Sequence, residues 1–159
     1  MDGYGGVIRD GKGCIQYIFH CNFGRATNNM AELMALEQCL EILKNNNLKN
    51  IIIEVDSELI INLIKRIYRG STPEKVLRYW RLVQDYQRIN SHLQNMRTSS
   101  FTHVRWTTNK LVDIIANKGA LCAKINIKYR WNEVSQGRLR DDCLSQAKAD
   151  RELYQNKGF

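Results

Sequence analysis

Apolar and polar residues are distributed along the chain in segments that predict an α/β fold. Residues 4–8 and 14–20 read as the two strands of a hairpin, because the Asp-Gly sequence between them is strong turn chemistry. Further strands are expected at 50–55 and 99–105, and helices at 29–44, 58–68, 74–91 and 110–123. This order of strands and helices is typical of α/β proteins.

The Ile-rich strand at 50–55 leads directly into a carboxylate. Its apolar side chains fall on both faces, which is typical of a strand inside a sheet that is covered on both sides. Asp56 follows at the carboxyl end of this strand, where ligand sites gather in such sheets. Two interpretations stay open: Asp56 serves chemistry, or Asp56 and Ser57 simply cap the next helix.

A second carboxylate, Glu32, lies on the apolar face of the helix expected at 29–44. At about 100° per residue, its neighbours on that face are Ala35, Leu36, Cys39 and Leu43. Glu37 and Glu41 fall on the opposite, polar face. A lone carboxylate among apolar side chains costs several kcal/mol unless it is paired or bound to a metal. The alternative is a first-turn Glu that the helix dipole or a capping box satisfies.

A third carboxylate, Asp113, shares a helix face with Ala116, Asn117 and Ala120, whose small size lets that face approach a sheet closely. Its alternative is an ordinary Asp at a helix start. Three carboxylates at inward or strand-end positions would repel one another unless cations bind them, and oxygen ligands favour Mg²⁺ or Mn²⁺. Two such ions, about 3.5–4 Å apart, assist phosphodiester hydrolysis. A calcium site is the rival interpretation, but the sequence has no DxDxDG-like loop to support it.

The net charge narrows the class of partner. The 159 residues include 24 Lys and Arg against 16 Asp and Glu, which gives a net charge of +8. A basic surplus favours a polyanionic partner such as nucleic acid. Basic residues are frequent in the middle of the chain: Lys65, Arg66, Arg69, Lys75, Arg78 and Arg81. They form either a phosphate-contact surface or an ordinary solvated face.

Several features bear on the cellular setting. No apolar run reaches the roughly 18 residues of a membrane span, and the N-terminus has no signal-peptide pattern. The five cysteines form no CxxC motif, so reduced thiols are expected. We therefore predict an intracellular protein, nuclear or cytoplasmic and not secreted, with no membrane partner.

Four stretches of the sequence, taken in order, are similar to one known family. They are GYGGVIRDGKG (3–13), TNNMAEL (27–33), IIEVDSELII (52–61) and FTHVRWTTNKLVDIIAN (101–117). Together they resemble the type 1 ribonuclease H domain, in the retrotransposon-like form associated with plant reverse transcriptases. The resemblance implies a mixed sheet flanked by helices over residues 1–123. Residues 124–159 lie outside the resemblance, and their composition predicts a polar, basic extension that is helical in part. The resemblance also implies endonucleolytic hydrolysis of the RNA strand of an RNA–DNA hybrid.

The resemblance gives roles to individual residues. Glu32, Asp56 and Asp113 match catalytic carboxylates that hold two Mg²⁺ or Mn²⁺ ions. His103 matches a mobile histidine that assists proton transfer or product release. Three further positions match substrate contacts: Asn28, Asn29 and Asn109. The first two correspond to contacts in the minor groove, where 2′-hydroxyls distinguish RNA from DNA.

One segment of the family pattern has no counterpart. The family begins with a strand that ends in Asp-Gly-Ser or a similar sequence, and no matching segment precedes the hairpin here. Asp2 falls where a loop is expected, so the role of the first carboxylate is not given to it. We therefore expect an N-terminally truncated fold without the Asp that bridges both metals. The functions then open are an active hybrid ribonuclease, a catalytically inactive nucleic-acid-binding module and a transposon-derived remnant.

Overall fold

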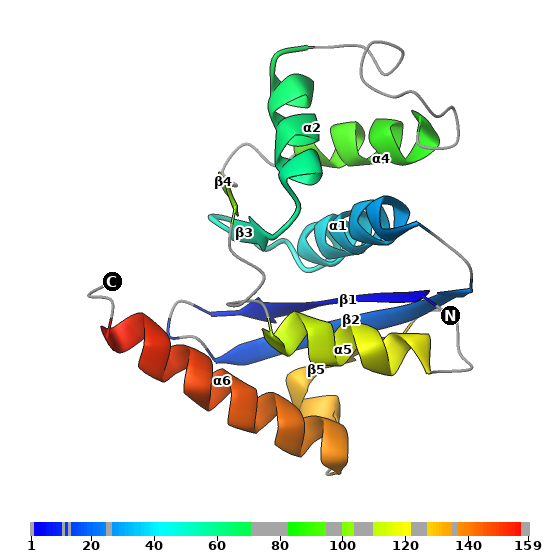
Figure 1. Cartoon of the computed structure of the whole chain (residues 1–159). Helices are drawn as coiled ribbons and strands as arrows, with labels where there is room; N and C mark the ends of the chain where they lie inside the picture. Colours follow the sequence, from blue (N-terminus) through cyan, green and yellow to red (C-terminus); the bar gives the residue numbers. More distant parts are fainter. Residues whose placement is uncertain are drawn as a thin grey trace. The chain divides into compact units, whose positions relative to one another are not determined.

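The computed structural model divides the chain into two compact units. One unit comprises Met1–Ala26 with Trp106–Phe159, and the other comprises Thr27–Arg105. The structure describes residues 2–10, 12, 14–24, 27–70, 83–94, 100–103, 110–121, 127–134 and 137–156. Their strands and helices follow one another in the order drawn in Figure 1, and they form the mixed α/β fold that the sequence predicts.

The first unit contains a three-stranded antiparallel sheet in the order β1-β2-β5. Its strands are β1 (Asp2–Arg9), β2 (Ile15–Gly24) and β5 (Ile127–Arg130). Asp10 fixes the turn between the first two, because its Oδ1 accepts the backbone N–H groups of Lys12 and Cys14, each at 2.9 Å. The predicted hairpin is confirmed. The third strand, β5, comes from the segment that the sequence interpretation treats as a polar extension.

Helix α5 (Lys110–Ala120) packs on β1 and β2, and helix α6 (Arg138–Asn156) packs on α5 (Figure 1). A short 3₁₀ turn, η3 (Trp131–Glu133), joins β5 to α6. These elements share one core: Ile15, Ile18, Leu111, Ile115, Val134, Cys143 and Ala147. α5 can approach β1 so closely because residue 5 is a glycine. A Cβ on Gly5 would lie 2.8 Å from Ile115 Cγ2 and 3.0 Å from the backbone nitrogen of Ala116.

The second unit begins with helix α1 (Asn28–Asn45), whose N-cap is Thr27. The Thr27 Oγ1 accepts the N–H of Met30 at 3.3 Å. A stripe along α1 is buried: Leu33, Leu36, Leu40, Ile42 and Leu43. Helix α4 (Val83–Gln94) packs against α1 and buries Tyr86, Ile89 and Leu93. The helix predicted at 74–91 is thus confirmed from Val83 onward, while residues 71–82 lie outside the described part.

Strands β3 (Ile52–Val55) and β4 (Ser100–His103) form a parallel pair in the second unit. Helix α2 (Glu58–Tyr68) contacts both strands and buries an apolar face of five residues, Ile60, Ile61, Leu63, Ile64 and Ile67. Ile53 is 6% exposed, whereas Ile52 on the opposite face is 67% exposed. The expectation that this strand is covered on both faces is therefore wrong, because the described layer of helix covers one side of it only.

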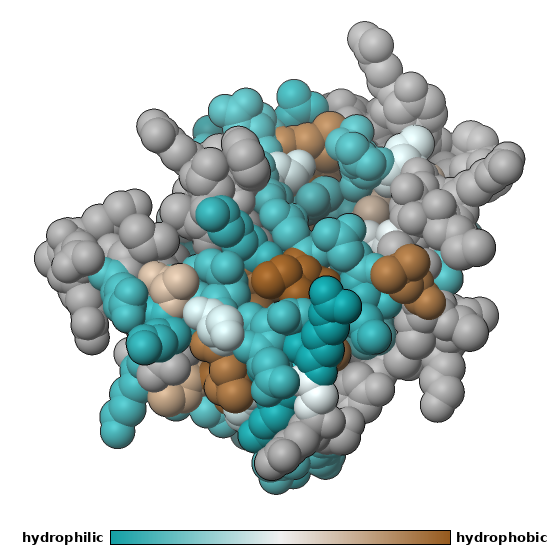
Figure 2. Space-filling model, turned by 60° about the horizontal axis from the view of Figure 1, so that its bottom comes forward, coloured by the Kyte–Doolittle hydropathy of each residue, from teal (hydrophilic) through white to brown (hydrophobic). Residues whose placement is uncertain are grey.

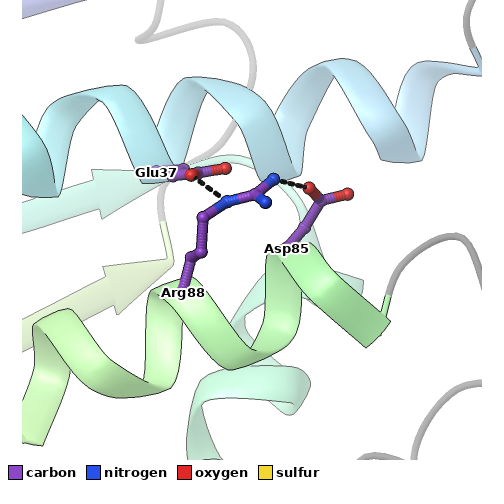
Figure 3. A network of polar contacts seen from close by, with 3 residues as sticks. All are labelled: Glu37, Asp85 and Arg88. Atoms are coloured by element: carbon purple, nitrogen blue, oxygen red, sulfur yellow. Dashed lines mark hydrogen bonds and ion pairs between the residues drawn. The ribbon is translucent and has the colours of Figure 1, made fainter.

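Arg88 lies between two carboxylates at the contact of α1 with α4 (Figure 3). Its Nε donates to Glu37 Oε1, and its Nη2 donates to Asp85 Oδ1. Burial raises the pKa of Asp85, and the Arg88 guanidinium counteracts that shift. The sequence places Glu37 on the polar face of α1, and there it meets Arg88. Helix α4 covers that face, and Arg88 supplies the counter-charge that a half-buried carboxylate needs.

Three of the exposed large apolar side chains, Ile52, Leu59 and Tyr68, lie on β3 and α2 of the second unit. Two others, Leu121 and Leu144, lie in the first unit. The face drawn in Figure 2 is mostly hydrophilic, with small hydrophobic groups between the polar ones. Isolated apolar residues of this kind are normal on protein surfaces. Among the helices that the structure describes, none is long and apolar enough to cross a membrane.

Candidate active site

Asp56 lies at the carboxyl end of β3, in the residue between the strand and the N-cap of α2. The cap is Ser57, whose Oγ accepts the N–H of Ile60 at 3.4 Å. The capping interpretation therefore explains Ser57 but not Asp56, since the capping oxygen comes from Ser57. Asp56 is half-buried. A half-buried carboxylate just past a strand end is well placed for chemistry at that edge of the sheet.

His103 is the last residue of β4 and pairs in register with Val55 of β3. The two strands are parallel, so their carboxyl ends lie at the same edge. Asp56 follows Val55 directly, and the backbones of Asp56 and His103 are therefore brought to one edge of the sheet. Their roles in catalysis stay a prediction.

Glu32 lies in the second unit as well, early in α1, and it is half-buried. It sits beside the buried stripe that includes Leu36 and Leu43, as its helical position predicts. The capping-box alternative is excluded. With Thr27 as N-cap, the residue that would complete such a box is Met30, which has no carboxylate. Asn28 and Asn29 occupy the first two positions of α1 and are exposed, so both are available to a ligand.

Asp113 lies on α5, in the first unit. The expectation that it takes an inward position is wrong, because its side chain is exposed. The buried face of α5 is set by Leu111 and Ile115, which are 1% and 0% exposed, and Asp113 falls between them on the other side of the helix. Asn109, the remaining predicted site residue, lies outside the described residues.

The predicted ligands have the chemistry of a divalent-cation site, since all three are carboxylates. Glu32 and Asp56 belong to one unit and Asp113 to the other. Within the described residues, no group of three His, Cys, Asp or Glu side chains is gathered closely enough to hold a metal ion. The donor set therefore fits Mg²⁺ or Mn²⁺ by its chemistry, and the three-ligand site stays a prediction.

Sequence reasoning missed the polar groups inside the first unit. His20 on β2 is 3% exposed, and its pKa is lowered by burial and, to a lesser degree, by the nearby Lys118 charge. Arg9 and Asp150 form an ion pair of 2.7 Å across 141 residues of sequence. Hydrophobic periodicity carries no signal for a pair between such distant residues, so these contacts appear only once the chain is folded.

The chain was compared with curated proteins and with solved structures. No curated protein is significantly similar to the chain. Among solved structures, RNase H1 from the archaeon Halobacterium salinarum is 29% identical, with a TM-score of 0.58 over 74% of this chain and 83% of its own. LC11-RNase H1, isolated from compost by a metagenomic approach, is 25% identical, with a TM-score of 0.59 over the same shares.

A more distant structure agrees in fold. The N-terminal RNase H domain of a Mycobacterium tuberculosis protein is 18% identical, with a TM-score of 0.51 over 75% of this chain and 90% of its own. The family model described as reverse transcriptase-like matches residues 2–119, which is most of the chain. The protein therefore belongs to the reverse transcriptase-like family, and its fold is that of ribonuclease H.

Proposed function

We propose that this protein binds RNA–DNA hybrids and hydrolyses their RNA strand. The observation that supports it most is the meeting of Asp56 and His103 at the carboxyl edge of the β3–β4 pair. This edge belongs to a chain whose family match spans 2–119 and which is 29% identical to a ribonuclease H1. We also propose that the protein is intracellular and that it is of the plant, retrotransposon-associated form of ribonuclease H.

Each predicted residue has a task in this reaction. Glu32, Asp56 and Asp113 would hold divalent cations, which when bound activate a water and stabilise the leaving oxygen. His103 would transfer a proton or assist release of the cut strand. Asn28 and Asn29, exposed at the start of α1, would contact 2′-hydroxyls in the minor groove. The products would carry a 3′-hydroxyl and a 5′-phosphate.

The first carboxylate of the family would come from a further strand that bears Asp. In the described part of the first sheet, β1 pairs with β2 on one side only. In the described part of the second, β3 pairs with β4 on one side only. Each of these strands therefore presents an edge that another strand could join. We include in the proposal that full activity requires such a strand.

Cleavage of a labelled hybrid tests the proposal. The chain is assayed in Mg²⁺ and in Mn²⁺, alone and with an upstream Asp-Gly-Ser strand fused to it. We expect weak or no cleavage alone and cleavage of the RNA strand, but not the DNA strand, after fusion. A fused protein that melts cooperatively and binds hybrid yet never cuts it would overturn the catalytic proposal.

That last outcome would favour a second function, an inactive nucleic-acid-binding module. Its support is the net charge of +8, which favours a polyanionic partner without requiring catalysis. Binding without cleavage would leave the basic surface and the exposed Asn28 and Asn29 as the functional residues.

The basic end of α2 is expected to contact phosphates. Lys65, Arg66 and Arg69 are all exposed there. Each phosphate contact contributes about 0.7–0.9 to the slope of log K against log[salt], so changing all three to Gln is expected to lower the slope for hybrid binding by about two. The other predicted phosphate contacts, Lys75, Arg78 and Arg81, lie outside the described residues.

Fluorescence anisotropy across a salt series measures this slope. The matched control changes three other exposed basic residues, Lys12, Arg138 and Lys148, and so removes the same net charge elsewhere. Equal slopes for the two triple variants would show that general charge, and not the end of α2, governs binding.

A further inference from the structure

The last turn of α2 carries an exposed tyrosine next to several cations. Tyr68 is 56% exposed, although it lies on a helix that buries five apolar side chains. At about 100° per residue, Tyr68 falls at the border of that buried stripe, and Lys65 and Arg69 follow it on the outer face. Both are exposed, as is Arg66. The end of α2 therefore presents an aromatic ring and positive charge on one surface.

No acidic residue offsets this charge within the same stretch of sequence. Residues 59–70 include three cations and no Asp or Glu. The helix dipole favours cations in a last turn, so Lys65 and Arg69 have an ordinary explanation. The dipole does not explain why a large aromatic side chain lies beside them with more than half of its surface in water. The tyrosine therefore calls for a partner of its own.

The ring of Tyr68 is held on one side by a second aromatic ring. It meets Phe101 of β4 edge to face, with ring centroids 6.5 Å apart and an interplanar angle of 62°. Space is open next to it, since a Cβ on the following glycine, Gly70, would meet no described atom within 4 Å. An oriented and exposed aromatic ring is the geometry on which a planar ligand stacks.

An aromatic ring beside cations selects one class of ligand. The cations attract the phosphates of a nucleic acid, and the ring stacks on its bases. Inside a duplex, each base is covered by the base pairs above and below it, so it offers no free face to Tyr68. An unpaired base offers its face. The end of α2 therefore fits single-stranded nucleic acid better than it fits a continuous duplex.

This surface lies away from the proposed chemistry. Asp56 precedes the first turn of α2, and Tyr68 is the last residue of the helix. The eleven residues of α2 span about 16 Å along the helix axis. A substitution at Tyr68 is therefore expected to leave the edge with Asp56 and His103 intact.

We propose that Tyr68 stacks on an unpaired base while Lys65 and Arg69 contact the adjoining phosphates. The ligand is a single-stranded stretch of nucleic acid, and the favoured substrate is a hybrid that continues into a single strand. The stacking site depends on the geometry of α2 alone. Its use with hybrids rests on the proposed function.

Binding of labelled oligonucleotides tests the site without any cleavage. Fluorescence anisotropy is measured in a metal chelator with an oligodeoxythymidylate, an oligouridylate, a blunt hybrid, and the same hybrid with a deoxythymidine tail. Tyr68→Ala is expected to weaken binding of both single strands and of the tailed hybrid by about 5- to 100-fold. Its affinity for the blunt hybrid is expected to stay within about twofold of the parent. A loss confined to the DNA or to the RNA strand also supports the site and identifies the strand that it takes.

Three further variants separate stacking from other effects. Tyr68→Phe keeps the ring and is expected to bind like the parent. Tyr68→Leu keeps an apolar side chain against Phe101 but has no ring, so it is expected to lose affinity as Tyr68→Ala does while preserving the fold. Leu59→Ala shortens another exposed apolar side chain of α2 and is the matched control, with no expected change in binding.

Unchanged affinity of Tyr68→Ala and Tyr68→Leu for the single strands would overturn the proposal and leave a protein partner as the occupant of this surface. Equal losses for the blunt and the tailed hybrid would also overturn it, because Tyr68 would then contact the duplex. A protein that binds the tail through Tyr68 but never cuts a hybrid would contradict the proposed function and leave the stacking site in place. The two failures are thus told apart.

Discussion

Asp56→Asn is expected to lower the rate of RNA-strand hydrolysis by about a thousandfold, which corresponds to about 4 kcal/mol of transition-state stabilisation. The amide keeps the shape of the side chain but loses the charge that a divalent cation requires. Ser57 caps α2, so the substitution removes no capping oxygen and the fold is expected to persist. The measurement is single-turnover cleavage of a labelled hybrid by whichever form of the protein cuts it.

The affinity of Asp56→Asn for the hybrid is not expected to fall with its rate of hydrolysis. A carboxylate near the phosphates of the substrate repels them, so its removal leaves affinity unchanged or raises it. Lost cleavage with intact binding therefore places Asp56 in the chemical step. Lost binding together with an altered melting temperature would instead assign Asp56 to the fold.

Glu54→Gln is the matched control. Glu54 lies on the same strand, two residues before Asp56, is exposed, and carries the same charge. Its substitution removes an equal charge from the same region and is expected to leave hydrolysis within about twofold of the parent. If both variants lose activity equally, the electrostatic field of the strand matters and a specific role for Asp56 is contradicted.

The sequence predicted the parts of the second unit that depend on local patterns. The limits of α2 and its Ser57 cap follow from one apolar stripe and one capping residue, and both are confirmed. Asp56 was assigned to a strand end by the same reasoning, and the structure places it there. Such features need only a few neighbouring residues, so periodicity and capping chemistry suffice to find them.

The errors concern burial, which depends on what packs where. The polar face of α1 that carries Glu37 is covered by α4, where Arg88 meets Glu37, and no pattern in the sequence predicts that cover. Asp113 was placed inward on account of its small neighbours, yet Leu111 and Ile115 decide which side of α5 is buried. Ile52 was expected to be covered and is exposed. In each case the helical or strand period was right, and the partner that covers the face was not readable from the chain.

Prediction and structure differ most in the segment after residue 119. Its composition predicts a polar extension that is helical in part. Helix α6 confirms the helical part, but β5 joins the sheet beside β2 and α6 contributes Cys143 and Ala147 to the core. A strand of four residues gives too short a pattern to detect. An ion pair between residues 9 and 150 gives no pattern in the sequence at all.

Gly5→Ala is expected to destabilise the folded protein by about 1–2 kcal/mol. The added Cβ would lie 2.8 Å from Ile115 Cγ2 and 3.0 Å from the Ala116 nitrogen, and the second of these is backbone that cannot turn aside. Overpacking of this kind costs about 1–3 kcal/mol, and the smaller conformational freedom of Ala in the unfolded chain returns about 0.4–1 kcal/mol. Differential scanning calorimetry is expected to show a melting temperature lower by about 2–8 °C.

A double-mutant cycle with Ile115→Ala identifies the contact responsible. Ile115→Ala alone removes a fully buried side chain and is expected to cost about 2–5 kcal/mol. In that background the Cγ2 methyl is gone, so Gly5→Ala should cost less than it does in the parent, by about 1 kcal/mol. Additive effects would mean that the clash lies with backbone atoms, the Ala116 nitrogen and the Phe19 oxygen, which a Cβ on Gly5 would meet at 3.0 Å each. No loss of stability in either background would contradict the close approach of α5 to β1, on which the placement of Asp113 depends.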